Sequence, residues 1–579
     1  MRAARISVCT VVAFALAGLL GTAEPSKSAV PSNPDTRTIV HALNRLGFGP
    51  APGDVERVRS LGLQAYIDQQ LRPERIEDAA MAQRLATFDT LSKSTRDMAE
   101  NYFLPAQMAR REQQRQQAAQ PTTKPPDPSM TETAPSDAAA AKRAAMTPEQ
   151  MAAVRMEREA LGELMQAKVL RAAYSDRQLQ EVMVDFWFNH FNVFAGKGAV
   201  RLYLNEYERD AIRPHVFGKF RDLLQATAES PAMLFYLDNW QSSAPEGAMT
   251  TDAQRPNNNR RRIMLGNPGN RRVPLTPQQQ QRVARNRPRG LNENYARELM
   301  ELHTLGVDGG YTQKDVQEVA RAFTGWTIAN PRQGGSFRFE PRMHDDGEKI
   351  VLGHKIKGGG GQKDGDQVLD LLAVHPSTAR FIATKLTRRF VADEPPPALV
   401  ERAAKRFRET DGDIREVVRT IVTSPEFFAA GAYRAKVKTP FEFVVSAVRA
   451  TGTDARNAQL LVGAIRNLGM PLYGCQPPTG YADKAEAWVN SGALLNRMNF
   501  AVSLTSPTAA LRRDPRGSGD APRPLQGRAV TAPSVTSDVL VASVLAGELS
   551  ESTAGTIAKA TTQPQALALV LGSPEFQRR

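Results

Sequence analysis

The chain has 579 residues, 41% of them hydrophobic and 23% charged, which is enough apolar material for one large core or a few ordinary ones. Its 75 basic and 61 acidic residues give a net charge of +14, a modest excess for this length that does not by itself indicate a nucleic-acid partner. Only 2 cysteines are present, which excludes a disulfide-stapled scaffold and a four-cysteine zinc or iron–sulfur site.

The N-terminus resembles a secretory leader. Arg2 and Arg5 precede an uncharged, mostly apolar run at residues 6–20, and small residues follow at 21–23. This order is typical of a cleaved signal peptide, so we expect residues 1–23 to be removed and the protein to be exported to the periplasm or outside the cell. The apolar run is too short to span a bilayer comfortably, and no later stretch is longer. We therefore expect no transmembrane segment after cleavage.

Helix signals dominate the rest of the chain. Thr36–Leu46 is predicted as a helix that ends at a turn over residues 47–53; Asp54 then opens a second helix that runs toward Gly62, and a third runs on to Leu71. Further start signals stand at Ser175, Ser230, Asn292, Thr312, Ser424 and Ser573. Only residues 337–352 have strand character, which predicts a hairpin around residues 345–347. We therefore predict a mainly α protein, a multi-helix globular body with one small β-hairpin.

Two stretches interrupt this body. Residues from about 110 to 147 and from about 242 to 288 are rich in proline and glutamine and lack apolar periodicity, so we expect long disordered insertions there. The second is also rich in arginine and suits an anionic polymer, or it is simply a solvated loop; it lacks the interleaved aromatic residues of a nucleic-acid site. The expected organisation is a mobile segment at 24–37, the helical body at 38–504, and a loop with C-terminal helices at 505–579.

Polar residues inside an apolar helix are the first candidate site. Residues 178–194 are apolar on most sides, but four polar residues share one narrow stripe at helical spacing. The stripe consists of Glu181, Asp185, Asn189 and Asn192. It either faces solvent or lines a wet pocket. His190 points to the apolar side beside Phe186, where a histidine hydrogen-bonded within the core is the alternative to a ligand.

Glu298 is the second candidate. In the helix expected over 292–305, Tyr295, Leu299 and Leu302 form the core stripe, and Glu293 with Arg297 forms a charge pair on the solvated side. Glu298 lies on the edge of the apolar face, between Leu302 and Leu305.

A carboxyl group at that edge is desolvated, which raises its pKa and suits a general acid. Glu301, one turn on and closer to water, can stay ionised as a partner base or metal ligand. The alternative is a buried Glu298 satisfied by an arginine or a helix N-terminus.

Longer motifs carry a resemblance to a known family. They lie at residues 185–194, 207–215, 230–234, 237–239, 291–307, 309–312, 324–326, 344–345, 375–379 and 477–481. These segments resemble the bacterial family catalogued as domain of unknown function 1800, over about residues 38–504. The resemblance implies an exported protein without an assigned activity. It also implies a partner, because genes of this family often neighbour those of an exported family similar to phosphatases and sulfatases.

Three classes of function remain open. The first is an exported hydrolase or lyase that acts on a polysaccharide-like polymer with a pair of carboxyl groups. Glu298 is then the acid, and Glu301 or Asp238 is the base or nucleophile. The side chains expected to hold sugar hydroxyls are Asp185, Asn189, Asn239 and Asn294.

The second class is a non-catalytic module that binds an envelope polysaccharide or the neighbouring exported protein. The third is a metal-dependent enzyme, because acidic and histidine ligands suit zinc, manganese or iron. Its candidate ligands are Asp185, Glu298, Glu301, His190, His303 and His344. No spacing among them is diagnostic, and the sequence identifies no cofactor.

Overall fold

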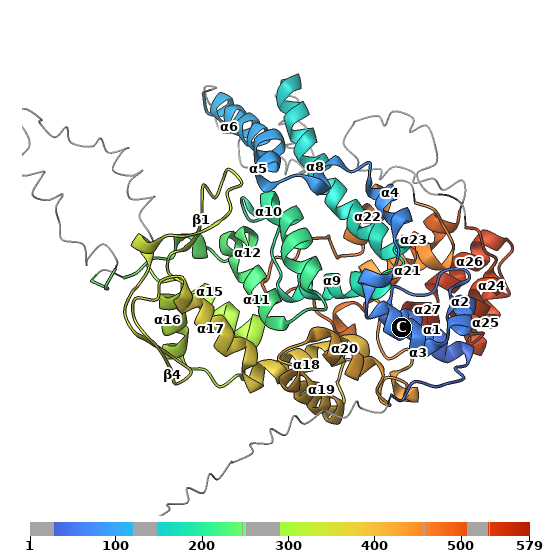
Figure 1. The fold of residues 1–579 in the computed structure, drawn as a ribbon. Coiled ribbons are helices and arrows are strands. Elements are labelled where there is room, and N and C mark those ends of the chain that lie inside the picture. The colour runs from blue at the N-terminus through green and yellow to red at the C-terminus, as the bar shows by residue number, and fades with distance from the viewer. Residues whose placement is uncertain are drawn as a thin grey trace, which may run out of the picture.

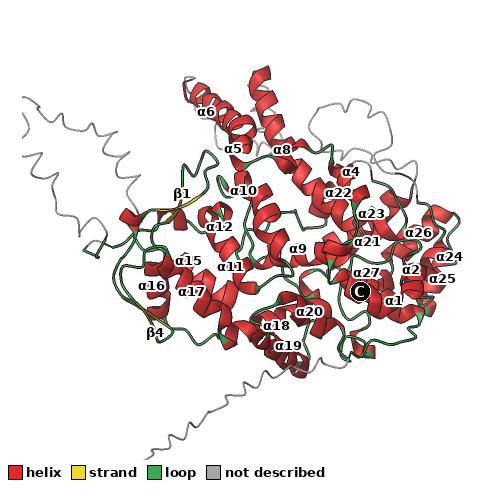
Figure 2. Ribbon diagram, viewed as in Figure 1, coloured by secondary structure: helices red, strands yellow, loops and turns green. Residues whose placement is uncertain are grey.

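The computed structural model describes residues 28–119, 147–245, 247–250, 290–455, 458–506, 531 and 533–579. The expected leader at residues 1–23 lies outside this part of the chain, as do the central portions of both expected insertions. Helices make up most of the described chain and are accompanied by two small sheets (Figures 1 and 2). The prediction of a mainly α protein is confirmed.

The first helices form where the sequence places them. Asp35 caps α1 by accepting a hydrogen bond from the Thr38 N–H at 2.8 Å, and nearly all of the helix beyond its first turn is buried. Just before it, the Ala29 N–H donates to the Thr423 carbonyl at 2.9 Å, which ties the start of the described chain to the body. The helices of this part are α1 (Thr36–Leu46), α2 (Asp54–Leu61), α3 (Leu63–Gln70), α4 (Ala79–Leu85) and α5 (Thr95–Met98).

One helix extends into the start of the first expected insertion, and another begins where the insertion ends. α6 (Leu104–Ala119) continues through residues 110–119, and α8 (Pro148–Tyr174) begins with a capping box in which Thr147 and Gln150 exchange hydrogen bonds. The boundary predicted at 110 is therefore wrong, because alanine, glutamine, arginine and glutamate are good helix formers even without an apolar stripe.

Helix α9 (Gln178–His190) crosses the middle of the molecule (Figure 1). It packs against α1, α3 and α8, and Leu179, Val182 and Trp187 are fully buried. It also contacts the π-helix η4 (Tyr207–Ile212). The helices that follow it in the chain are α10 (Val200–Glu206), α11 (Phe220–Glu229) and α12 (Pro231–Tyr236). The capping box expected at Ser175 does not form, because the Gln178 side chain donates instead to the carbonyls of Ala172 and Ser175.

A second group of helices follows in the chain, and its members α18, α19 and α20 lie below α9 in the view of Figure 1. α18, α19 and α20 pack against one another, and α18 also contacts the π-helix η7. The elements of this group are α15 (Glu293–Glu298), η7 (Leu299–Thr304), α16 (Gln313–Ala322), α17 (Lys363–Val374), α18 (Pro376–Phe390), α19 (Pro397–Glu409) and α20 (Ile414–Val422). Ser424 starts no helix; its hydroxyl donates to the Ile421 carbonyl and accepts from the Phe427 N–H in a turn.

The strands pair differently from the expected hairpin. β2 (Phe337–Phe339) pairs back with β1 (Trp326–Ile328), and β3 (Lys349–Val351) pairs forward with β4 (His354–Ile356), both antiparallel. The segment between β2 and β3 cannot be a hairpin tip, because the Asp345 carboxylate is buried and ion-paired with Arg321 at 2.8 Å. The single hairpin predicted over 337–352 is replaced by two small sheets.

The C-terminal helices return to the N-terminal ones. α26 packs against α23, α24, α25 and α27, and α24 packs on α1. Their bounds, with those of the helices before them, are α21 (Pro440–Ala450), α22 (Gln459–Asn467), α23 (Ser491–Thr505), α24 (Ser537–Val544), α25 (Glu551–Ile557), α26 (Gln563–Gly572) and α27 (Pro574–Gln577). Among the helices described, none combines the length and apolar character needed to cross a bilayer.

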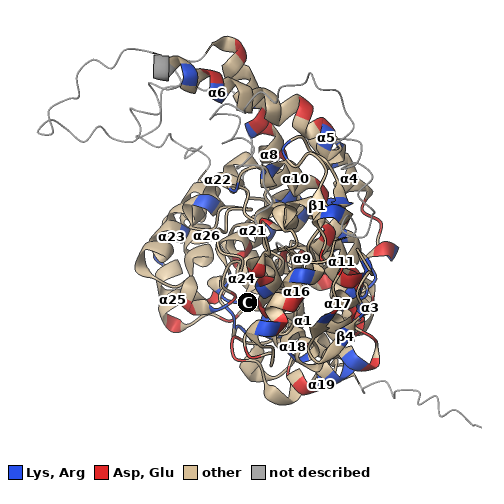
Figure 3. Cartoon of the chain, turned by 90° about the vertical axis from the view of Figure 1, so that its left-hand side faces the viewer, with Lys and Arg blue, Asp and Glu red and all other residues tan. Residues whose placement is uncertain are grey.

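Charges on the outside are mixed. In the view of Figure 3, basic and acidic positions alternate along the described helices and do not gather into one basic face.

Candidate functional site

Glu298 lies half-buried at the end of α15, as its helical position predicts. Burial raises the pKa of its carboxyl, the nearby Glu301 raises it further, and Arg297 opposes them. Among the described residues, no side chain forms a hydrogen bond or an ion pair with it. The raised pKa agrees with the expected direction, and Arg297 lowers it without forming an ion pair with the carboxyl. A catalytic role for Glu298 stays a prediction.

The helix around Glu298 differs from the predicted one. Because residues Leu299–Thr304 form a π-helix, the buried positions shift to Met300, His303 and Thr304, and Leu302 is left partly exposed. The expected pair of Glu293 with Arg297 does not form either, since both side chains bind Gln313 instead.

The other proposed carboxylates are only partly available. The Tyr311 hydroxyl donates to Glu301 at 2.9 Å, and burial and that carboxylate raise the pKa of Tyr311 to about 12. Asp238 has a left-handed backbone and forms an ion pair with Lys197 at 2.9 Å. Asn294 is exposed on α15. Glu298 and Glu301 therefore lie near each other, but the structure gives Asp238 a partner of its own.

The polar stripe of α9 mainly holds other parts of the chain. Arg213 donates to both Glu181 oxygens, at 2.6 and 3.0 Å. Asn189 exchanges two hydrogen bonds with the Tyr481 main chain, at 2.7 and 2.8 Å, and Asn192 donates to the carbonyls of Cys475 and Pro477. The stripe thus fixes the segment 475–481 across α9. The sequence predicted either a solvent-facing stripe or the wall of a wet pocket, and neither prediction included this structural role.

Asn239 and His344 have structural partners in the described chain. The Asn239 amide is buried and donates to the carbonyls of Phe323 and Trp326. His344 is fully buried, with one ring nitrogen 2.8 Å from the Thr324 carbonyl and the other 3.2 Å from Asp364. In the described parts of the chain, no three His, Cys, Asp or Glu side chains gather closely enough to hold a metal ion.

A cavity of about 270 Å³ lies between α9, α18 and the segment 479–484. We call it the Lys385 pocket. Two predicted substrate-binding residues, Asp185 and Asn189, lie in its wall. The other lining residues are Phe186, His190, Lys385, Arg388, Arg389, Thr439, Met470, Thr479, Tyr481, Ala482, Asp483 and Lys484.

A chain of hydrogen bonds runs from this pocket into the core. The Nε2 atom of His190 lies 3.1 Å from the His303 carbonyl, so Nε2 carries the proton and donates it. The Nδ1 atom is then an acceptor, and the Lys385 Nζ donates to it at 2.9 Å. Burial and the Lys385 charge lower the pKa of His190, which keeps the ring neutral. His190 is therefore a satisfied core histidine that also positions a lysine.

Most charges around the pocket are already neutralised. Asp185 pairs with Lys168 at 2.8 Å, Asp483 with Lys436 at 2.9 Å, and Lys484 with Glu394 at 2.9 Å. Arg389 is buried against Glu442.

Two cations of the pocket keep their charge uncompensated. Within the described residues, neither Lys385 nor Arg388 forms an ion pair; Arg388 donates to the Asp393 carbonyl at 3.0 Å. The pocket is left with an excess of positive charge, which suits an anionic group.

Sequence reasoning missed Lys385. The signal was available, because Lys385 follows the buried Ile382 by three residues and directly precedes the buried Leu386, on the edge of the apolar face of α18. Like Glu298, Lys385 is a charged residue at the edge of an apolar helix face, so the reasoning that identified Glu298 also identifies Lys385. That the lysine faces α9 depends on contacts between residues nearly 200 positions apart.

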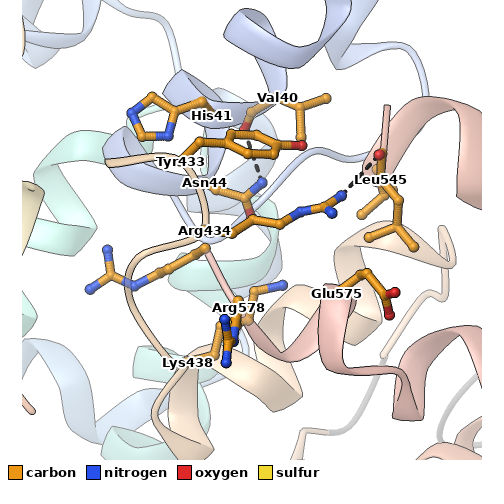
Figure 4. A pocket seen from close by; sticks show the side chains of 11 residues that line it. Val40, His41, Asn44, Tyr433, Arg434, Lys438, Leu545, Glu575 and Arg578 are labelled. Carbon is orange, nitrogen blue, oxygen red and sulfur yellow. Dashed lines mark hydrogen bonds between the residues drawn. The ribbon is translucent and has the colours of Figure 1, made fainter. Parts of the chain in front are cut away.

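A second cavity lies where α1 meets the C-terminal helices (Figure 4). It is about 10 Å³, room for roughly one water molecule. Figure 4 shows the Arg434 guanidinium donating to the Leu545 carbonyl and the Asn44 amide donating to the Val40 carbonyl. This seam holds the two ends of the described chain together and is too small for an organic ligand.

Comparison with known proteins identifies one family. The profile described as "Protein of unknown function (DUF1800)" matches residues 41–578. No curated protein and no solved structure matches the chain.

Proposed function

Because the chain belongs to the DUF1800 family, whose description assigns no activity, we propose a function from its own geometry: it recognises an acidic polymer through the Lys385 pocket. The expected class of polymer is an envelope polysaccharide. The leader-like residues 1–23 support the proposal that the protein acts outside the cytoplasm, where such polymers lie.

The observation that carries this proposal is the uncompensated charge. Lys385 and Arg388 are one turn apart on α18 and both line the cavity, while the acidic residues beside them are paired with other cations. A carboxylate or sulfate group entering the cavity would gain hydrogen bonds that the described protein groups leave unmade. Charge-assisted bonds of this kind contribute about 1.5–3 kcal/mol each.

Binding to a charged polymer and to its neutral form tests the proposal. Polygalacturonate carries one carboxylate per sugar, and its methyl ester removes the charge while keeping the backbone. We expect the protein to bind polygalacturonate and not the methyl ester. We expect Lys385→Met to weaken binding of polygalacturonate by about 10- to 100-fold. Lys405→Met is the matched control, because that side chain is 70% exposed on α19 and its one ion pair among the described residues is with the neighbouring Glu409.

Equal binding of the acid and the ester would contradict the proposal, as would equal losses in the Lys385→Met and Lys405→Met variants. Thermal melts of each variant establish that a loss of binding is not a loss of fold.

A second candidate function, hydrolysis of the polymer, rests on Glu298. Its half-buried carboxyl has a raised pKa and no partner in the described chain, which suits a proton donor to a leaving group. Release of reducing ends from an acidic polysaccharide, abolished by Glu298→Gln, would support it. Release that persists in the variant would remove Glu298 from the reaction.

A further inference from the structure

Lys385 differs from an ordinary binding lysine in what holds it. Its Nζ donates to a neutral imidazole nitrogen and not to a carboxylate, and the imidazole is locked in one tautomer by the His303 carbonyl. A carboxylate partner would favour the ammonium form strongly; a neutral histidine accepts a hydrogen bond from the ammonium and from the free amine alike. The arrangement positions the nitrogen without fixing its charge.

The charged and titratable groups around Lys385 come from every element that forms the pocket. They are Asp185 and His190 on α9, His303 on η7, Arg388 and Arg389 on α18, and Tyr481, Asp483 and Lys484 on the segment 479–484. Asp483 favours the ammonium form, but it lies in an ion pair with Lys436, whereas Arg388 opposes the ammonium form from the next turn of α18. Together these groups favour the free amine of Lys385 more than the surroundings of a surface lysine favour its free amine.

We propose that Lys385 is a nucleophilic amine that forms an imine with the aldehyde of an acidic ligand held in the pocket. The open-chain reducing end of a uronic acid belongs to this class, so the inference rests on the proposed function and narrows its ligand. The Nζ lone pair attacks the carbonyl carbon, and the nitrogen loses two protons as the carbonyl oxygen leaves as water, so that one C=N bond replaces the C=O bond. His190 acts as a positioning residue.

Burial lowers the pKa of Lys385 to about 8, from an ordinary value of 10.5. At pH 7 this makes the reactive free amine about 300-fold more abundant than at an ordinary lysine. Because lowering the pKa also weakens the nucleophile, we expect a net gain in reactivity of roughly tenfold or more.

The test uses the wild-type protein with two small aldehydes, each with cyanoborohydride to reduce the imine to a stable secondary amine. Glyoxylate is acidic and glycolaldehyde is neutral. Peptide mass spectrometry then follows each lysine separately. Lys484 is the internal control, since it lines the same cavity but pairs with Glu394.

We expect glyoxylate to modify Lys385 at least about tenfold faster than Lys484 at pH 7, with a midpoint near pH 8, and to react faster than glycolaldehyde. If Lys385 reacts with neither aldehyde below pH 9 while polygalacturonate still binds, the inference is overturned and the proposed function stands. If Lys385 reacts equally with both aldehydes, the amine is reactive but the acid preference fails, and with it the inferred ligand class.

Discussion

Glu442→Gln should strongly destabilise the protein, because Glu442 is the shared anion of a buried cationic cluster. The side chain is 4% exposed at the first turn of α21. Arg389 donates to it, and the Arg579 Nε lies 3.0 Å away; both arginines are buried. The neutral amide leaves two guanidinium groups without their counter-charge in the core.

The expected loss follows from which contacts survive. Glutamine keeps an oxygen that can accept the Thr439 N–H, now bound at 2.9 Å, so the helix cap is retained. What is lost is the charge opposite Arg389 and Arg579, and breaking a buried pair in this way costs about 3–5 kcal/mol. Glu394→Gln is the matched control: its side chain is 84% exposed in a pair with Lys484, so we expect almost no change in the free energy of unfolding.

Urea unfolding followed by tryptophan fluorescence measures both variants. Burial raises the pKa of Glu442, but the two arginines lower it more, so the pKa lies below its usual range. The stabilisation from the Glu442 carboxylate is therefore fully present above the unfolded pKa near 4.3, and it is lost as the pH falls toward the pKa of the folded state. The difference between wild type and Glu442→Gln should therefore shrink in acid. A Glu442→Gln variant within 1 kcal/mol of wild type at pH 7 would refute this reasoning, taking ~1 kcal/mol as the scale of an ordinary substitution.

Three further outcomes are expected. Glu298→Gln should keep or slightly raise stability at pH 7, because a carboxyl with a raised pKa favours the folded state only as the pH falls; a loss of about 3 kcal/mol in a urea titration would instead indicate a buried ion pair. Asn192→Ala should lower the free energy of unfolding by about 1–3 kcal/mol, because it removes the hydrogen bonds to the carbonyls of Cys475 and Pro477. We expect faster proteolysis of the segment 475–481 in this variant, and unchanged cleavage would show that other contacts hold the segment. N-terminal sequencing of the exported protein should begin at Glu24, and recovery of the uncleaved chain only in the cytosol would defeat the proposed export.

Local signals in the sequence predict the helices well. Ser230, Asn292, Thr312 and Ser573 all cap helices as expected, because a cap depends only on residues within one turn. The raised pKa of Glu298 is predictable for the same reason, since its position on the helix edge already determines much of its burial.

Features that depend on distant contacts could not be predicted. The π-helix at Leu299–Thr304 changes which residues of that helix are buried, and nothing in the local pattern shows it. Asn189 carries the carboxamide group expected of a sugar-binding residue, but this amide donates a hydrogen bond to the main chain of Tyr481, 292 positions away. The Lys385 pocket likewise is lined by residues of α9, of α18 and of the segment 479–484, which are far apart in the sequence.

The central claim is that the Lys385 pocket accepts an anionic group. Anomalous diffraction from crystals soaked in selenate tests it most directly, because selenium locates the anion without reference to any assay. We expect a peak within hydrogen-bonding distance of the Lys385 Nζ and the Arg388 guanidinium, and its loss in Lys385→Met crystals. Peaks at surface arginines with none in the pocket would contradict the account.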